Sequence, residues 1–215
     1  MSFIEKTMME NFKTEQEVFW AGSFGSNYIS RNKSEKLLAS NVSFFSRIFK
    51  SIDKISSCLE FGANIGMNLR AIQLLLPNIA MKAIEINAQA CIELSKVIGK
   101  ECVFQESILD YQNYEKFDLV LVKTVLIHIN PEMLSSVYQK LYEASSKYIL
   151  VCEYYNPAPV TINYRGHDNR LFKRDFAGEL MDKYSNLKLL DYGFVYKRDV
   201  NFPQDDINWF LLEKH

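Results

Sequence analysis

The chain has 215 residues, of which 48% are hydrophobic, and its formal net charge at pH 7 is −1. This length suits a single domain whose core is large enough to fold without a metal or disulfide. The near-neutral charge argues against a general polyanion-binding protein, which carries a clear excess of basic residues.

The four cysteines, Cys58, Cys91, Cys102 and Cys152, lie within or beside apolar runs, and no two of them have CxxC spacing. We expect small buried thiols in a reducing compartment and no metal site. The N-terminus mixes charges into its apolar residues, unlike a signal peptide, and no apolar run is long enough to span a membrane. These features predict a cytoplasmic protein that binds neither membrane nor nucleic acid, and they leave its oligomeric state open.

Apolar residues recur at helical spacing over residues 4–20 and 33–50, and the segment AGSFGSNYISRN between them is typical of a loop. From residue 55 onwards, strand-like and helix-like segments alternate. The predicted strands are 55–61, 80–86, 102–105, 117–122, 147–153, 187–196 and 207–213, and the predicted helices are 68–76, 88–98, 131–144 and 172–184.

This alternation predicts an α/β fold with a doubly wound, mostly parallel seven-stranded sheet covered by helices on both faces. The last two strands have no helix between them, so they can form an antiparallel pair at one edge. We expect residues 1–54 to form an N-terminal helical cap or extension, and residues 55–215 to form the main domain as a single folding unit.

The turn after the first predicted strand reads Glu60-Phe61-Gly62-Ala63-Asn64-Ile65-Gly66. Its glycines allow a sharp turn and a close approach of a ligand to the backbone, at the strand end where open α/β sheets bind ligands. A dinucleotide-binding turn would have the spacing G-x-G-x-x-G, and its middle glycine is absent here. A phosphate-free nucleoside such as S-adenosylmethionine (SAM) therefore fits better than NAD, with Glu60, Gly62, Ala63, Asn64 and Gly66 as candidate cofactor residues.

Further candidates follow the next three strands. Glu85 ends the second strand, beside Ile86, where a carboxylate can accept both ribose hydroxyls. Each of these signals is weak alone, since a plain strand–helix turn or a solvated acid explains it equally well. The remaining candidates follow the third and fourth predicted strands: they are Glu106, Ser107 and Ile108, and Lys123 and Thr124.

In this order, the four signals resemble those of the class I SAM-dependent methyltransferases. The resemblance implies a Rossmann-like fold, SAM as the cofactor and S-adenosylhomocysteine as its product. It also implies that Glu106, Ser107 and Ile108 lie near the adenine and that Lys123 and Thr124 lie near the methionine half.

Methyl transfer to a hydroxyl also needs a group that takes the proton. His128, Glu153 and His167 are the candidate bases, although His128 could merely line the pocket and Glu153 could be a structural partner of a loop N–H or of an Arg. The connection after residue 153 is rich in side chains that bind polar ligands, and an Arg fork suits a carboxylate or phosphate. Its candidate acceptor-binding residues are Tyr154, Tyr155, Asn156, Tyr164 and Arg165.

Several segments, including TEQEVFWAGSFGSNYISRN, VLIHINPEML, EYYNPAPVTINYRG and PQDDINWFLLEK, resemble the pseudaminic acid biosynthesis-associated methyltransferases. Bacteria encode that family beside genes for nonulosonic acid sugars of flagellin and surface glycans. The resemblance implies an acidic sugar, or its nucleotide-activated form, as the acceptor. The alternatives are a methyltransferase for another small molecule or a protein, and a non-catalytic SAM-binding module in a glycan assembly complex. The absence of an N/D-P-P-Y tetrad after the fourth strand argues against a nucleic-acid methyltransferase.

Overall fold

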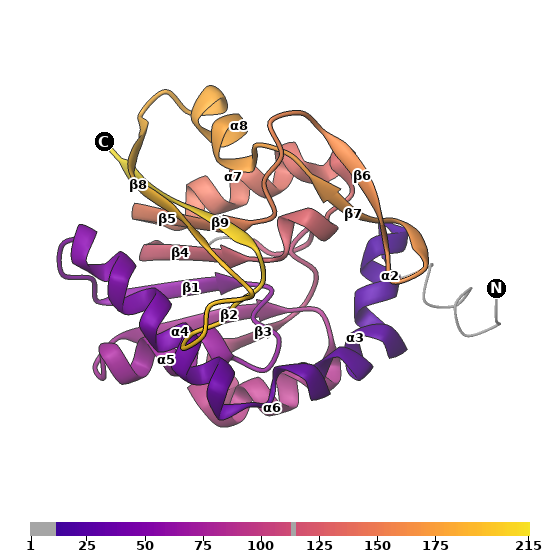
Figure 1. The fold of residues 1–215 in the computed structure, drawn as a ribbon, viewed down its shortest axis with the longest axis horizontal. Helices are drawn as coiled ribbons and strands as arrows, with labels where there is room; N and C mark the ends of the chain where they lie inside the picture. The colour runs from indigo at the N-terminus through magenta and orange to yellow at the C-terminus, as the bar shows by residue number, and fades with distance from the viewer. Residues whose placement is uncertain (1–11, 113–114) are drawn as a thin grey trace.

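The computed structural model describes residues 12–112 and 115–215, which form a central seven-stranded sheet flanked by helices (Figure 1). Five strands are parallel: β1 Ser57–Phe61, β2 Ala80–Glu85, β3 Val103–Gln105, β4 Phe117–Lys123 and β5 Ser145–Glu153. Two further strands, β8 Leu187–Val195 and β9 Ile207–Lys214, pair antiparallel at one edge. The order β3-β2-β1-β4-β5-β9-β8 confirms the predicted fold class.

Helices α4 Glu35–Ile48, α5 Met67–Leu75 and α6 Ala88–Ile98 cover one face of the sheet, and α7 Leu134–Ala144 and α8 Phe176–Lys183 cover the other (Figure 1). Residues of β4 alternate between the two cores: Leu119 and Leu121 face α4–α6, whereas Val120 and Val122 face α7 and α8. This explains the continuous apolar run of β4, since a parallel strand buried on both faces needs apolar side chains in both directions. Short 3-10 helices complete the connections: η2 Phe49–Ser51, η3 Lys100–Cys102, η4 Leu126–His128 and η5 Pro131–Met133.

The N-terminal segment differs from the prediction. The first helix of the described residues, α2 Glu15–Ala21, begins at a capping box of Thr14 and Glu17, while residues 4–11 of the predicted helix lie outside the described part of the chain. The predicted loop is wrong, because it contains α3 Ser23–Tyr28 and η1 Ile29–Asn32. A tertiary contact overrides the local glycine signal: the Asn87 side chain donates to the Trp20 carbonyl oxygen at 3.1 Å, and a Cβ on Gly25 would lie 1.9 Å from that same oxygen.

A second correction concerns the connection after β5. Instead of a loop, it contains a separate antiparallel hairpin of β6 Val160–Tyr164 and β7 His167–Lys173. Arg165 and Gly166 form its two-residue turn, with φ values of 54° and 85°. Helix α8 therefore starts at Phe176 rather than at residue 172, where the Asp175 side chain accepts from the Gly178 N–H.

Helix α4 shares its core with the sheet. Phe45 and Ile48 are fully buried in the cluster that contains Leu119 and Trp209. Helices α2 and α3 lie beyond the carboxyl ends of β1 and β2, where the β6–β7 hairpin also reaches them (Figure 1). Within the described ranges, no helix is both long and apolar enough to cross a membrane.

Candidate functional site

A cavity of about 520 Å³ opens where the parallel strands end, beside the point at which the strand order reverses between β1 and β4. Its floor comes from residues 62–65, 85–87, 107–109 and 123–125, which follow β1, β2, β3 and β4. Residues of α2, α3 and η1 and of the β8–β9 loop form its other walls. Ligands of open α/β sheets bind in this crevice.

The turn after β1 requires its glycines. Gly62 and Gly66 have φ values of 73° and 79°, in the left-handed region, and a Cβ on Gly62 would lie 2.6 Å from a methyl group of Val125. The Gly66 N–H donates to the Ala63 carbonyl at 2.9 Å and closes the turn, although Gly66 itself does not line the cavity. Asn64 also has a positive φ, of 49°, and lines the cavity.

Glu85 is buried at the end of β2 and lines the cavity. One carboxylate oxygen accepts the Asn64 N–H and the other accepts the Asn87 N–H, both at 2.7 Å. Burial raises the pKa of Glu85, and these N–H donors oppose the rise by favouring the charged form. Two carboxylate oxygens offer about four lone-pair sites, so Glu85 retains acceptor capacity for ligand hydroxyls.

Glu60 lies beneath the turn, fully buried and outside the cavity lining. Burial raises its pKa to about 8, and the Asn68 side-chain amide donates to it at 2.6 Å. Glu60 therefore acts indirectly, because it hydrogen-bonds Asn68, which lines the cavity.

Ser107 and Ile108 line the cavity after β3, whereas Glu106 does not. The Ser107 hydroxyl bonds the buried Glu17 carboxylate of α2, which also accepts the Thr14 N–H at 2.7 Å. This contact joins the N-terminal helix to the floor of the cavity.

Lys123 and Thr124 line the cavity after β4, as does the neighbouring Val125. Thr124 has a φ of 56°, which is a strained conformation for a β-branched residue. Such strain is found mostly at functional sites.

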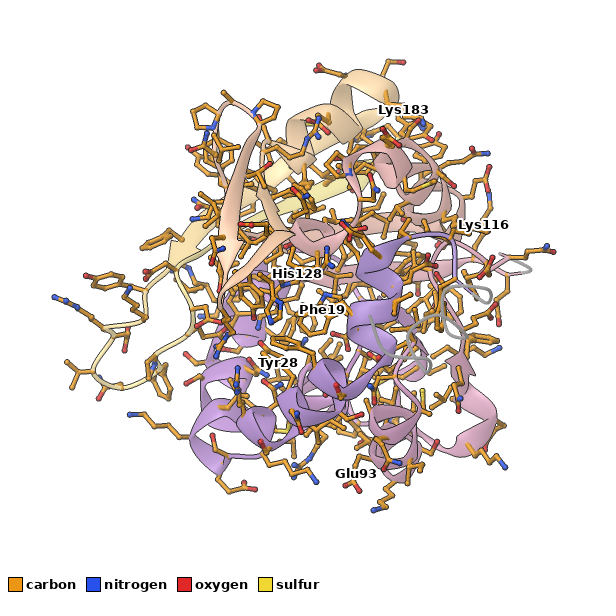
Figure 2. The ribbon with its side chains drawn as sticks, turned by 90° about the vertical axis from the view of Figure 1, so that its right-hand side faces the viewer. Phe19, Tyr28, Glu93, Lys116, His128 and Lys183 are labelled. Atoms are coloured by element: carbon orange, nitrogen blue, oxygen red, sulfur yellow. The ribbon has the colours of Figure 1, made fainter. Side chains whose placement is uncertain are left out.

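His128 ends η4, is buried and lines the cavity, and its ring contacts the rings of Trp20 and Tyr164 at centroid distances of 4.6 and 4.9 Å. Burial lowers its pKa to about 4, so the ring is neutral near pH 7. Its Nδ1 bonds the Arg170 carbonyl oxygen, which can only accept, so Nδ1 carries the proton and Nε2 keeps a free lone pair. Figure 2 looks onto this end of the molecule, with Phe19, Tyr28 and His128 between the N-terminal helices and the hairpin.

The other two candidate bases lie outside the cavity lining. One oxygen of the buried Glu153 accepts the N–H groups of Val125 and Leu126 at 2.9 and 2.8 Å, at the start of η4. Burial raises its pKa to about 8. His167 is exposed on β7 and packs against the Phe19 ring at 5.0 Å.

The candidate acceptor residues separate into two groups. Arg165 lines the cavity, Tyr164 packs on His128, and Tyr154 hydrogen-bonds Asp205 of the β8–β9 loop. Tyr155 and Asn156 lie outside the lining: the Tyr155 ring contacts Phe210 at 5.9 Å, and the Asn156 amide donates to the Ala158 carbonyl at 2.6 Å.

Sequence reasoning missed the walls contributed by the N-terminal helices and the β8–β9 loop. The Thr14–Glu17 capping-box spacing could have located the start of α2. No local signal marks the loop residues. The missed lining residues include Gln16, Glu17, Trp20, Tyr28, Arg31, Asn41, Lys197, Gln204 and Asp205.

The cavity walls also carry unsatisfied hydrogen-bonding groups. In the part of the chain that the structure describes, four buried side-chain atoms without a partner belong to lining residues: Gln16 Oε1, Trp20 Nε1, Asn64 Oδ1 and Gln204 Oε1. Buried polar atoms in native proteins nearly always have a partner. Three of these four atoms are acceptors and one is a donor, so the residues that line the cavity retain hydrogen-bonding capacity.

No family model and no curated protein sequence matches the chain. Several solved structures are similar to it in fold. The plantazolicin methyltransferase BpumL in complex with S-adenosylhomocysteine aligns with a TM-score of 0.64 and 12% identity, over 99% of each chain. A SAM-dependent methyltransferase of Leishmania major aligns with a TM-score of 0.69 and 14% identity, over 97% of this chain and 90% of that one.

The glycopeptide N-methyltransferase MtfA aligns with a TM-score of 0.60 and 12% identity, over 82% of this chain and 95% of that one. At these identities, the likeness concerns the fold. Together with the strand order and the glycine turn, it shows that the chain has the fold of the class I SAM-dependent methyltransferases.

Proposed function

We propose that this protein is a SAM-dependent methyltransferase that methylates an oxygen or nitrogen of a small acidic acceptor. The observation that carries the proposal is the cavity at the strand ends, which is lined by the buried Glu85, by His128 and by four residues that each have an unpaired buried polar atom. The methyltransferase fold of its structural neighbours supports the same reading.

The cofactor residues would be those of the cavity floor: Gly62, Ala63, Asn64, Glu85, Ile86, Ser107, Ile108, Lys123 and Thr124. Glu85 would accept the ribose hydroxyls, and Ile108 offers an apolar contact for the adenine. When bound, SAM supplies an electrophilic methyl group on its sulfonium.

His128 would act on the acceptor. Its neutral ring and fixed tautomer leave Nε2 free to accept the proton of an acceptor hydroxyl or amine. The Trp20 and Tyr164 rings pack against the imidazole, and His128 is 7% exposed.

The acceptor is proposed to be an acidic sugar of the nonulosonic, pseudaminic type, or its precursor, as the family resemblance implies. Arg165 supports this, since its guanidinium stands at the cavity and lies 5.5 Å from the centre of the Tyr164 ring. The names of the structural neighbours include peptide, glycopeptide and polyketide-system methyltransferases, so a different acceptor is the principal alternative. A non-catalytic SAM-binding module in a glycan assembly complex is the other.

Mass spectrometry of nonulosonic acids from cells with and without the gene tests the proposal directly. We expect a methylated acidic sugar that disappears with the gene. Purified protein should bind SAM and S-adenosylhomocysteine in calorimetry. Absence of binding to either ligand would refute the cofactor assignment, whereas cofactor binding without turnover of any acceptor would favour the non-catalytic module.

A further inference from the structure

Two arginines from distant segments of the chain line the same cavity. Arg31 belongs to η1, and Arg165 belongs to the turn of the β6–β7 hairpin. Both line the cavity, and both interact electrostatically with the hydroxyl of Tyr28. The hairpin and the N-terminal helices therefore contribute positive charge to the same place.

Each guanidinium is held against an aromatic ring. The Arg31 carbon Cζ lies 5.8 Å from the centre of the Tyr28 ring, and the Arg165 Cζ lies 5.5 Å from that of Tyr164. An arginine stacked in this way keeps its N–H edge available for a planar anion. Throughout residues 12–112 and 115–215, neither side chain has a carboxylate or hydrogen-bond partner, so both forks are available to a ligand.

The backbone of Arg165 adds an independent observation. Its φ of 54° is rare for a residue with a side chain, and two-residue hairpin turns of this kind favour Asn or Gly at that position. An arginine there keeps a guanidinium at the hairpin tip at the expense of an unfavourable backbone conformation. Such outliers concentrate where the side chain binds a ligand.

The charges around these arginines indicate which anion fits. Asp205 lines the same part of the cavity, interacts with the Tyr28 hydroxyl and hydrogen-bonds Tyr154. Lys197 also lines the cavity, but its ammonium pairs with Asp206 at 3.1 Å. Two unpaired arginines and one carboxylate leave a single positive charge in excess, which matches a monoanion.

We propose that Arg31 and Arg165 form a two-arginine clamp that binds one carboxylate of the acceptor, and that Asp205 disfavours dianionic phosphates. This inference rests on the proposed function, because it specifies how that acceptor is recognised. It makes the N-terminal segment part of the specificity site. A carboxylate bound between two planar forks satisfies both its oxygens with charge-assisted hydrogen bonds. A phosphate dianion adds a second negative charge, which Asp205 repels.

The experiment is calorimetry on the full chain saturated with S-adenosylhomocysteine. The probes are N-acetylneuraminic acid, which carries one carboxylate, its neutral methyl ester, and N-acetylglucosamine 6-phosphate. We expect the acid to bind about tenfold or more tightly than either other probe. Arg31→Ala and Arg165→Ala should each weaken binding of the acid by about 10- to 100-fold, the scale of a charge-assisted hydrogen bond, with little effect on the ester.

Two further variants complete the design. Arg198→Ala removes an exposed arginine of the β8–β9 loop that does not line the cavity, and we expect it to change nothing. Asp205→Asn should reduce the ratio of the affinity for the acid to the affinity for the sugar phosphate. Unchanged melting temperature and S-adenosylhomocysteine affinity show that the variants remain folded.

The clamp is overturned if Arg31→Ala leaves the affinity for the acid within about twofold of wild type, if the acid does not bind, or if the phosphate binds more tightly. Any of these results, obtained while S-adenosylhomocysteine still binds, leaves the methyltransferase proposal standing. Failure of S-adenosylhomocysteine to bind instead refutes the proposed function itself.

Discussion

Replacement of Glu153 by glutamine separates a structural role from a catalytic one. The carboxylate is 2% exposed and outside the cavity lining, and one of its oxygens accepts two backbone N–H groups at the start of η4, the helix that ends at His128. A glutamine carbonyl can accept the same two bonds without ever becoming charged. We therefore expect Glu153→Gln to keep η4 in place and to leave turnover largely intact.

The magnitude follows from the pKa of Glu153, which burial raises from 4.5 to about 8. Between these values, the folded protein holds a proton that the unfolded chain has released. The contribution of Glu153 to stability is therefore fully present below pH 4.5 and is lost as the pH rises through 8. One proton changes the free energy of unfolding by about 1.4 kcal/mol per pH unit, so between pH 5.5 and 7.5 wild type should lose about 2.5 kcal/mol that the variant retains.

Urea unfolding at these two pH values measures the difference. Glu60 also has a pKa raised to about 8, but it is present in both proteins and cancels in the comparison. Glu132→Gln, at an exposed carboxylate, is the matched control and should show the wild-type pH dependence. An identical pH dependence in Glu153→Gln and wild type would refute the linkage argument. A loss of kcat of about 10²-fold or more, with cofactor affinity unchanged, would identify Glu153 as a general base instead.

Four other predictions follow from the site. Gly62→Val should abolish S-adenosylhomocysteine binding in calorimetry, because its φ is 73° and a Cβ there would lie 2.6 Å from Val125; measurable binding would contradict this. Glu85→Ala should weaken that binding by about 1–3 kcal/mol, the scale for losing a charged acceptor, and an unchanged affinity would remove Glu85 from the cofactor site. His128→Gln should lower kcat by about 10²- to 10⁴-fold with cofactor affinity unchanged. Since burial lowers the pKa of His128 to about 4, the pH profile of wild-type kcat should show no histidine titration step near pH 6.5. Activity should be retained in EDTA, whereas activity restored only by Mg²⁺ would indicate a metal site that we do not expect.

Much of the fold follows from local sequence patterns. The run at residues 117–122 is apolar at nearly every position because β4 is buried on both faces, and such a pattern predicts a central parallel strand. The sequence also predicts the positions of Gly62 and Glu85 at the ends of their strands. A turn that needs positive φ and an acid at a strand end both depend on neighbours that are close in the chain.

Other features were decided by contacts between distant segments. Helix α3 forms through a glycine-containing stretch because the Asn87 side chain satisfies carbonyl groups at the end of α2. The β6–β7 hairpin was not predicted, because the polar and aromatic composition of its segment is typical of a loop.

The roles within the site also depended on tertiary structure. His128 and Glu153 are both titratable residues that follow buried strands, yet only His128 lines the cavity, while Glu153 is enclosed beneath η4. Arg31 and Asp205 carry no local signal of function, and they line the same cavity as Arg165 only because the N-terminal helices, the hairpin and the β8–β9 loop converge over the strand ends. Local periodicity determines which segments become strands and helices, whereas burial and charge at a site depend on which distant segments pack together there.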